Sequence, residues 1–265
     1  MTILVGVLCT DGMVIAADQQ VTHGAAGMQT VGQPTTKIQA LKEQALYASS
    51  GHVGIGQQLS AAIENLLDKF SKQEYSRISG SIKSELRQIL KPALETAGVA
   101  RQAVGGGAAM DAICTGLLAA NFKDGPKLID INMQGELEYL TPAVPFVCHG
   151  SGKFNADPLL RFLWNVYWRD KRPTLREGVL AGYWTVKAVI ELKTQGVGFE
   201  PDVFVVESGV ARQIENGKLR EHDEFIRAVE HAMRSVRDTM LAGATTQAAP
   251  VEAPPPPPPP AATGA

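Results

Sequence analysis

The second residue of the chain carries a group that could do covalent chemistry. Thr2 follows Met1, and its side chain is small enough that methionine aminopeptidase is expected to expose it. A terminal threonine combines a hydroxyl nucleophile with an α-amine of ordinary pKa about 8, so one residue can supply both nucleophile and base. Taken alone, Met-Thr is also an ordinary chain start, so the chemistry depends on the residues that surround it.

Four other residues are candidates for such surroundings, and each also has a structural interpretation. Asp18 ends the run MVIAAD, Lys37 opens KIQAL, Gly51 follows YASS, and Ser151 lies in HGSG. Taken alone, Asp18 and Lys37 would form a plain ion pair. Gly51 would serve a turn, and Ser151 would cap a helix.

Other motifs indicate no alternative site. The segment from His149 through Ser151 lacks the G-x-S-x-G spacing of a serine hydrolase, and no acidic partner for the histidine is identifiable. The glycines at 105–107 lack the Gly-Lys-Ser/Thr of a phosphate loop, and we favour a connecting role over a substrate contact. The histidines show no metal-ligand spacing, so neither a metal nor a cofactor is expected.

Apolar periodicity predicts the elements that must position these residues. Thr10-Asp11-Gly12 is a hairpin signal between the first two strands. Strands are expected at 3–9, 13–17, 44–50, 113–122, 127–133, 136–140, 146–149 and 202–207. Helices are expected at 59–70, 82–98, 159–166, 179–190 and 226–236, with Pro92 kinking or dividing the second. Helices in pairs between groups of antiparallel strands favour a layered sheet sandwich over a doubly wound fold.

Composition narrows the class of protein. The chain has 265 residues, 45% of them hydrophobic, and a net charge of −2, which gives no basic field for nucleic acid. Its three cysteines are widely spaced in apolar stretches, as expected of reduced thiols in the cytoplasm. The first residues form neither a signal peptide nor a membrane span. We expect the folded domain at 1–241 and a disordered, Ala/Pro-rich tail at 242–265, which includes seven consecutive prolines.

The first 150 residues resemble a proteasome β-subunit, an N-terminal nucleophile hydrolase of the threonine peptidase type. That family begins T-x-x-V-G-(apolar)-x-x-x-D-G-(apolar)₃-A-A-D, and TILVGVLCTDGMVIAAD reproduces the pattern from Thr2 to Asp18. The family's Lys and the Gly fourteen residues later correspond to Lys37 and Gly51, and its Gly-Ser-Gly to residues 150–152. Among bacterial relatives, the chain looks most similar to the HslV-like branch and to the proteobacterial proteasome homologues. The resemblance implies an α+β fold, a four-layer αββα sandwich.

The resemblance also implies a role for each matched residue. Thr2 would attack a peptide carbonyl through Oγ1 and form an acyl-enzyme. Lys37 would lower the pKa of the neighbouring amine, and Asp18 would hold that lysine charged and oriented. The backbone N–H of Gly51 would form the oxyanion hole, and Ser151 would complete the polar surroundings of the amine.

Two departures from the family pattern affect the support of this site. Archaeal and eukaryotic β-subunits carry an Asp and a Ser near the end of the fourth helix, where this chain has Leu192 and Gln195. Glu191 or Thr194 could contribute after a small shift. The Arg two residues beyond the first Asp is replaced by Gln20.

Substrate contacts follow from the same resemblance. The family binds peptide as an added antiparallel strand, and the matching backbone positions are Thr22, Gly51 and Val53. The side chains of Val21, Ser49 and Val53 would line the pocket for the residue before the cleaved bond.

The implied activity is that of a threonine endopeptidase enclosed in a homo-oligomeric double ring. Rings of six or seven subunits are both compatible with the sequence, and we favour seven, hence 14 subunits rather than 12. HslV works with an ATP-dependent unfoldase, but the sequence does not indicate one here. The alternative is a catalytically silent ring that acts as a scaffold or binding protein, which retention of Met1 would produce by blocking the amine.

Overall fold

The structure, a computed structural model, describes residues 2–22, 32–104, 113–169, 171–194 and 196–246. The chain divides into two units, Met1–His222 and Asp223–Ala265. The first contains both main sheets and the helices that cover them. The glycine-rich loop at 105–107 and the proline run lie outside the described residues.

The first sheet holds the N-terminal hairpin at its centre. Its strand order is β10-β1-β2-β11-β12, and every pairing is antiparallel. The strands are β1 (Leu4–Leu8), β2 (Gly12–Asp18), β10 (Phe146–His149), β11 (Pro201–Glu207) and β12 (Val210–Gln213). Residues Leu4 to Leu8 and Gly12 to Asp18 are all buried, because the sheet is covered on both faces.

The second sheet is also antiparallel, with strand order β5-β6-β7-β8-β9. Its strands are β5 (Ile38–Leu41), β6 (Ala45–Gly51), β7 (Cys114–Phe122), β8 (Gly125–Ile131) and β9 (Leu137–Tyr139). A separate two-stranded ribbon joins β3 (Gln20–Thr22) to β4 (Gly32–Pro34). This ribbon begins two residues after Asp18, so it borders the candidate site.

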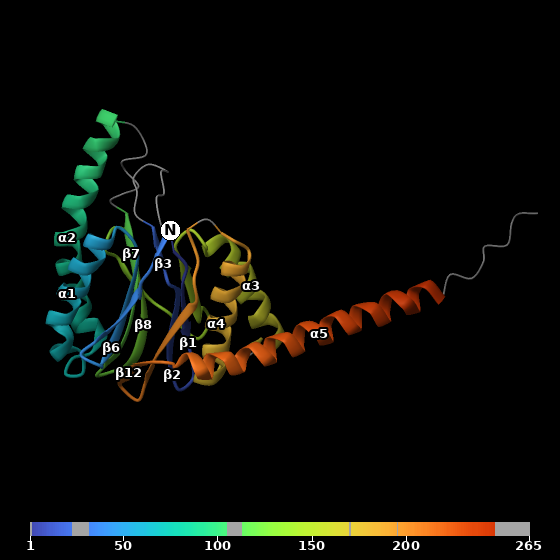
Figure 1. Ribbon diagram of the computed structural model, residues 1–265. Helices are drawn as coiled ribbons and strands as arrows, with labels where there is room; N and C mark the ends of the chain where they lie inside the picture. The colour runs from blue at the N-terminus through green and yellow to red at the C-terminus, as the bar shows by residue number, and fades with distance from the viewer. Residues whose placement is uncertain (1, 23–31, 105–112, 170, 195, 247–265) are drawn as a thin grey trace, which may run out of the picture. The chain divides into compact units, whose positions relative to one another are not determined.

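Helix pairs cover the outer faces of the two sheets, and the αββα sandwich is confirmed (Figure 1). The helices α1 (Val53–Phe70) and α2 (Tyr75–Val104) pack on the second sheet. On the first sheet lie α3 (Lys153–Leu163) and α4 (Leu175–Glu191), joined through a π-helical segment, η2 (Trp164–Trp168). None of the described helices is long and apolar enough to cross a membrane.

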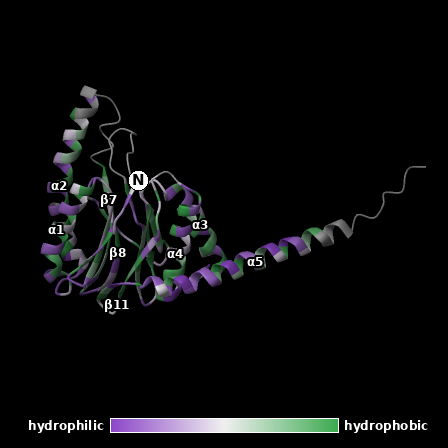
Figure 2. Cartoon of the chain, in the orientation of Figure 1, coloured by the Kyte–Doolittle hydropathy of each residue, from purple (hydrophilic) through white to green (hydrophobic). Residues whose placement is uncertain are grey.

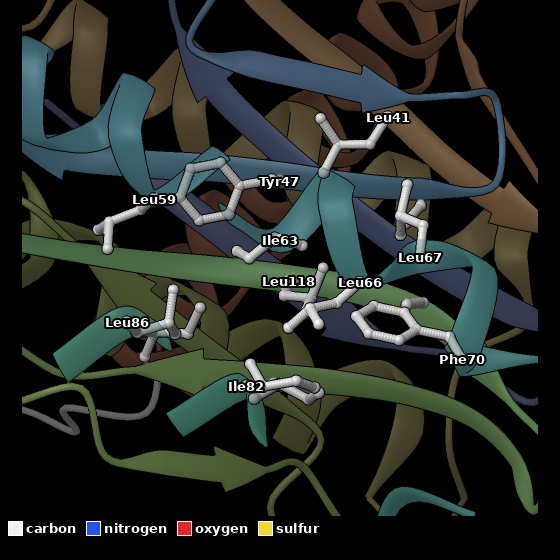
Figure 3. Packing of buried hydrophobic residues seen from close by; sticks show 14 of the residues in the cluster. Leu41, Tyr47, Leu59, Ile63, Leu66, Leu67, Phe70, Ile82, Leu86 and Leu118 are labelled. Atoms are coloured by element: carbon white, nitrogen blue, oxygen red, sulfur yellow. The ribbon is translucent and has the colours of Figure 1, made fainter. Parts of the chain in front are cut away.

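Two apolar clusters hold the layers together. One lies between the second sheet and its helices, where side chains of α1 such as Leu59 and Ile63 meet Tyr47 of β6 and Leu118 of β7 (Figure 3). The other lies between the sheets and includes Ile15 and Leu117. Burial of such side chains contributes roughly 1.5–3 kcal/mol each before conformational entropy is counted.

Several elements differ from the expectation from sequence. The short strands β3, β4 and β12 were not predicted, because three or four residues give too little alternation to detect. Pro92 lies inside α2 without ending it, and α2 runs as one helix. The last helix, α5 (Asn216–Thr246), extends beyond both ends of the helix expected at 226–236.

Candidate active site

A buried carboxylate is the centre of the candidate site. Asp18 ends β2 and its side chain is fully buried. Its Oδ1 accepts hydrogen bonds from the Ile3 amide at 2.9 Å and from Lys37 Nζ at 2.6 Å. Its Oδ2 accepts from the amides of Gln20 and Gly198, each at 3.1 Å. Because a buried charge is tolerated only when paired and hydrogen-bonded, this shell suits an ionised Asp18.

Lys37 stands directly before β5 and points its ammonium at Asp18. Its side chain is only 5% exposed, and this burial lowers the pKa of the Lys37 ammonium below its ordinary value. The charge and hydrogen bond of Asp18 act in the opposite direction but are the smaller influences. The lysine is therefore a cation whose proton is held less tightly than in water.

A tight turn encloses Thr2. The side chain of Thr2 is buried, and its nitrogen donates to Ser151 Oγ at 3.3 Å. The carbonyl of Thr2 accepts from the amide of Gly152 at 3.1 Å. Gly150 has φ +90°, and a Cβ there would lie 2.0 Å from the Thr2 carbonyl oxygen. The turn at 150–152 therefore needs glycine so that it can approach Thr2 this closely.

The helix-cap interpretation of Ser151 is wrong. The N-cap residue of α3 is Gly152, and no side chain caps that end of the helix. The Ser151 hydroxyl instead accepts from the nitrogen of Thr2. A residue that looks like a cap in the sequence is thus a neighbour of the candidate nucleophile.

Gly51 ends β6 in a conformation that favours glycine. Its φ is +120°, and a Cβ there would lie 1.8 Å from the carbonyl oxygen of Ile113. That carbonyl accepts from the amide of His52, whose ring accepts from Ile55 and so caps α1. His52 therefore caps a helix, and Gly51 marks the point where the strand turns into it.

A cavity of about 350 Å³ opens beside these residues. Thr2, Lys37 and Gly51 all line it. The predicted pocket residues Val21, Ser49 and Val53 also line it. Thr22 pairs with Gly32 in the β3–β4 ribbon.

Part of the cavity wall was missed by sequence reasoning. It comprises Gln33, Pro34, Thr35, Thr36, Gln39, Gly56 and Gln57. Gly56 and Gln57 follow Val53 at the i+3 and i+4 spacing of one helix face, which could have identified them. Gly56 also lets α1 approach β6, since a Cβ there would lie 2.3 Å from Ser49 Oγ.

The described residues at the first departure from the family pattern are exposed or bond elsewhere. Leu192 is 65% exposed and Glu191 is exposed, while Thr194 Oγ1 accepts from Asn155 Nδ2 at 2.9 Å. The amide of Gly198, from the same segment, reaches Asp18 instead. Gln195 lies outside the described residues.

Gln20, in the place of the family's arginine, lies between two backbone segments. A Cβ at Gly198 would lie 2.1 Å from its Oε1, and one at Gly32 would lie 2.7 Å from its Nε2. The glutamine thus fills the space between β4 and the Gly198 segment that supports Asp18.

His149 has an acidic partner that sequence reasoning did not identify. Its Nε2 lies 2.8 Å from Asp130 Oδ1, so the pair links β10 of the first sheet to β8 of the second. The Ser151 hydroxyl is hydrogen-bonded to the Thr2 nitrogen, so His149, Asp130 and Ser151 do not form the arrangement of a serine hydrolase.

An αββα sandwich with a threonine at the start of its first hairpin, beside a buried Lys–Asp pair, has the architecture of the N-terminal nucleophile class. The family model for the proteasome subunit matches residues 2–200. The chain belongs to the proteasome subunit family. Membership implies assembly into oligomeric rings in general and is consistent with a peptidase-type fold.

A solved structure is similar across most of both chains. It is the Gly-1 mutant of Anbu from Hyphomicrobium sp. strain MC1, with 17% sequence identity and a TM-score of 0.61. The match covers 88% of this chain and 97% of that chain, and it shows the shared fold. No curated protein matches the chain.

Proposed function

We propose that the chain is a threonine endopeptidase in which Thr2, freed by removal of Met1, attacks peptide bonds. The observation that carries this proposal is the buried Lys37–Asp18 pair beside Thr2, at the wall of a cavity. A purely structural ion pair would not need to lie beside a cavity that Thr2 and Gly51 also line. Perturbed, buried ionisable groups at a cavity are typical of catalytic sites.

The first half of the reaction forms an ester. The terminal amine takes the proton of the Thr2 hydroxyl, and Oγ1 bonds to the substrate carbonyl carbon. The Gly51 amide donates to the resulting oxyanion. The intermediate then collapses as the scissile C–N bond breaks, and the leaving amine takes the proton from the terminal ammonium.

The second half releases the acyl group. The amine takes a proton from water, and the hydroxide oxygen bonds to the ester carbon. The bond to Oγ1 breaks, Oγ1 regains a proton, and a peptide with a new carboxyl end leaves. No external electron donor or acceptor is required.

Lys37 acts on the amine through its charge. A cation nearby disfavours protonation of a second cation, so Lys37 keeps more of the amine in its basic form. Asp18 holds the ammonium in place, while its bonds to the Ile3 and Gln20 amides fix the chain on both sides of the site. Ser151 accepts from the Thr2 nitrogen and orients it.

Peptide substrate would lie along the backbone between β3 and the end of β6. The Thr22, Gly51 and Val53 backbones would pair with it as with an added strand. The side chain before the cleaved bond would enter the cavity lined by Val21, Ser49 and Val53.

The proposed assembly encloses the sites in a homo-oligomeric double ring, with 14 subunits favoured over 12. Enclosure limits access to unfolded protein or peptide. We propose neither nucleic acid nor a membrane as a partner. Whether an ATP-dependent unfoldase binds the ring is left undecided by the proposal. The three cysteines are free and buried, which favours a reducing cytoplasm.

The test is intact mass after incubation with an epoxyketone, which reacts with both the hydroxyl and the free amine of a terminal threonine. We expect one adduct per subunit, and none on Thr2→Ala. If chains that have lost Met1 form no adduct, the alternative of a silent ring scaffold is favoured. Leu192, exposed where relatives carry an acid, is the observation that supports this alternative.

A further inference from the structure

The last helix carries a heptad repeat. Along α5, apolar residues recur at alternating spacings of three and four, with one histidine in the series. The positions are Leu219, His222, Ile226, Val229, Met233, Val236 and Met240. This 3.5-residue period is that of a helix that packs along a seam against another helix.

The burial of this seam changes along the helix. Leu219 and Ile226 are buried, and the His222 ring lies 6.1 Å from that of Tyr183 in α4. Met233, Val236 and Met240 are 51%, 58% and 70% exposed. Figure 2 shows that α5 is mostly hydrophilic, with a few hydrophobic bands along it. Residues 229–240 thus continue the seam with mostly exposed apolar side chains, and we call them the distal seam.

We propose that the distal seam pairs in antiparallel orientation with the same segment of a second copy of this chain. The charges that flank the seam favour this orientation. Glu230 and Arg237 both occupy the e position of the heptad. In an antiparallel pair, e positions face e positions, so Glu230 lies opposite Arg237 of the second copy, and the two-fold axis repeats the contact. In a parallel pair they would face Phe225 and Ala232 instead.

The apolar side chains also match in size in this alignment. The register that pairs Glu230 with Arg237 sets Val229 opposite Met240 of the second copy, and Met233 opposite Val236. Every layer then combines a branched valine with a long, flexible methionine, which fills space more evenly than methionine against methionine. Ala232 and Thr239 flank the other side and are small enough for close approach.

The present partners of the two charged residues leave them available. Glu230 lies 3.9 Å from Arg234, and Arg237 lies 2.6 Å from Asp238, all on the surface of the same helix. Exposed pairs of this kind contribute little to stability. Exchange for a partner on the second copy therefore has a small cost.

The pairing is expected to be weak for two isolated chains. Four apolar layers bury less than the 1,200–2,000 Å² that is typical of stable interfaces. In a ring, several copies present the seam together, and each contact raises the effective concentration for the next. Because the contact is isologous, it joins copies in pairs and cannot close a ring by itself.

Cysteine cross-linking of the full-length protein tests the proposal. Met233→Cys and Val236→Cys chains, carrying different tags, are co-expressed and then oxidised. We expect a disulfide-linked pair that contains both tags, and little linkage in either variant expressed alone. The native thiols are buried and do not interfere. Ser235→Cys, on the opposite side of the helix, is the matched control and should not link.

Three results of the cross-linking experiment would overturn the proposal. Linkage within Met233→Cys alone, at the yield of the mixture, would mean parallel pairing. No linkage in the mixture would mean that the distal seam does not pair with itself. Linkage of Ser235→Cys at equal yield would mean random collision.

A charge exchange tests the orientation separately. In the cross-linking background, Glu230→Arg should lower the linked yield several-fold, because arginine then faces Arg237 of the second copy. Adding Arg237→Glu should restore the yield. Failure of the double variant to recover would refute the antiparallel register. Both tests are independent of peptidase activity, since neither variant changes a residue that lines the cavity.

Discussion

Replacing Asp18 with asparagine should destabilise the fold more than any other single polar change at the site. The carboxylate is fully buried and accepts from Lys37 and three backbone amides. In Asp18→Asn, an NH₂ group replaces one of the two acceptor oxygens. This group can only donate, yet it would lie against groups that also donate. The buried Lys37 ammonium loses the carboxylate charge that lies 2.6 Å from it.

Removal of one partner from a buried ion pair costs about 3–5 kcal/mol. For a domain of this size, each kcal/mol lowers Tm by roughly 2–4 °C, so the expected loss is on the order of 6–20 °C. Lys37→Met leaves Asp18 with its three amide donors and should cost less. The double variant, Asp18→Asn with Lys37→Met, should recover part of the loss, because the buried cation that lost its carboxylate partner is also removed.

Differential scanning calorimetry of the four proteins at matched subunit concentration measures these shifts. Matched concentration is needed because assembly contributes to apparent stability. An Asp18→Asn protein that melts within about 2 °C of wild type would refute the reasoning, since even 1 kcal/mol should be visible. A double variant that melts below both single variants would show that the Lys37–Asp18 pair is not the main interaction lost.

Three further predictions concern neighbouring residues. Gly51→Ala should cost more than the 1–3 kcal/mol typical of backbone strain, since its Cβ would clash with the Ile113 carbonyl, and calorimetry measures the loss. Ser151→Ala should change the free energy of unfolding by no more than about 1 kcal/mol, but it should slow epoxyketone labelling in a mass-spectrometric time course. Burial lowers the pKa of Lys37 in the folded protein below its ordinary value of 10.5. At a pH between the folded and the unfolded pKa, Lys37 binds more protons in the unfolded chain, so its contribution to stability should rise with pH in that range. Lys37→Met should remove this rise when melting is followed as the pH is raised towards 10.5.

The sequence contains enough information to predict the layers and the central pair. The Asp-Gly turn and the apolar runs around it predicted the β1–β2 hairpin, since turn type and alternation are local properties. Helices that arrive in pairs indicated a layered sheet sandwich, and the family resemblance supplied its αββα order. The prediction that Lys37 lies beside Asp18 rested on the family pattern, because nothing local connects residues 19 positions apart.

Other features could not be predicted, because they depend on backbone groups brought together by the fold. Every residue except proline has an amide N–H, so the sequence gives no sign that the one at Gly198 reaches Asp18. Likewise, the role of Ser151 was ambiguous between a helix cap and a contact to Thr2 until the turn at 150–152 was seen to wrap around Thr2. The His149–Asp130 contact joins two sheets and has no local signal.

The contact between Gly198 and Asp18 also has a consequence for the timing of folding during protein synthesis. Asp18 is made early, but one of its donors is about 180 residues downstream, and β11, which follows at Pro201–Glu207, is the neighbour of β2 in the centre of the first sheet. A nascent chain that has not yet released this segment from the ribosome cannot complete the surroundings of Asp18. A growing polypeptide of this kind therefore contains Thr2 and Asp18 long before it can complete the contacts of Asp18, which must wait until Gly198 and β11 have been made.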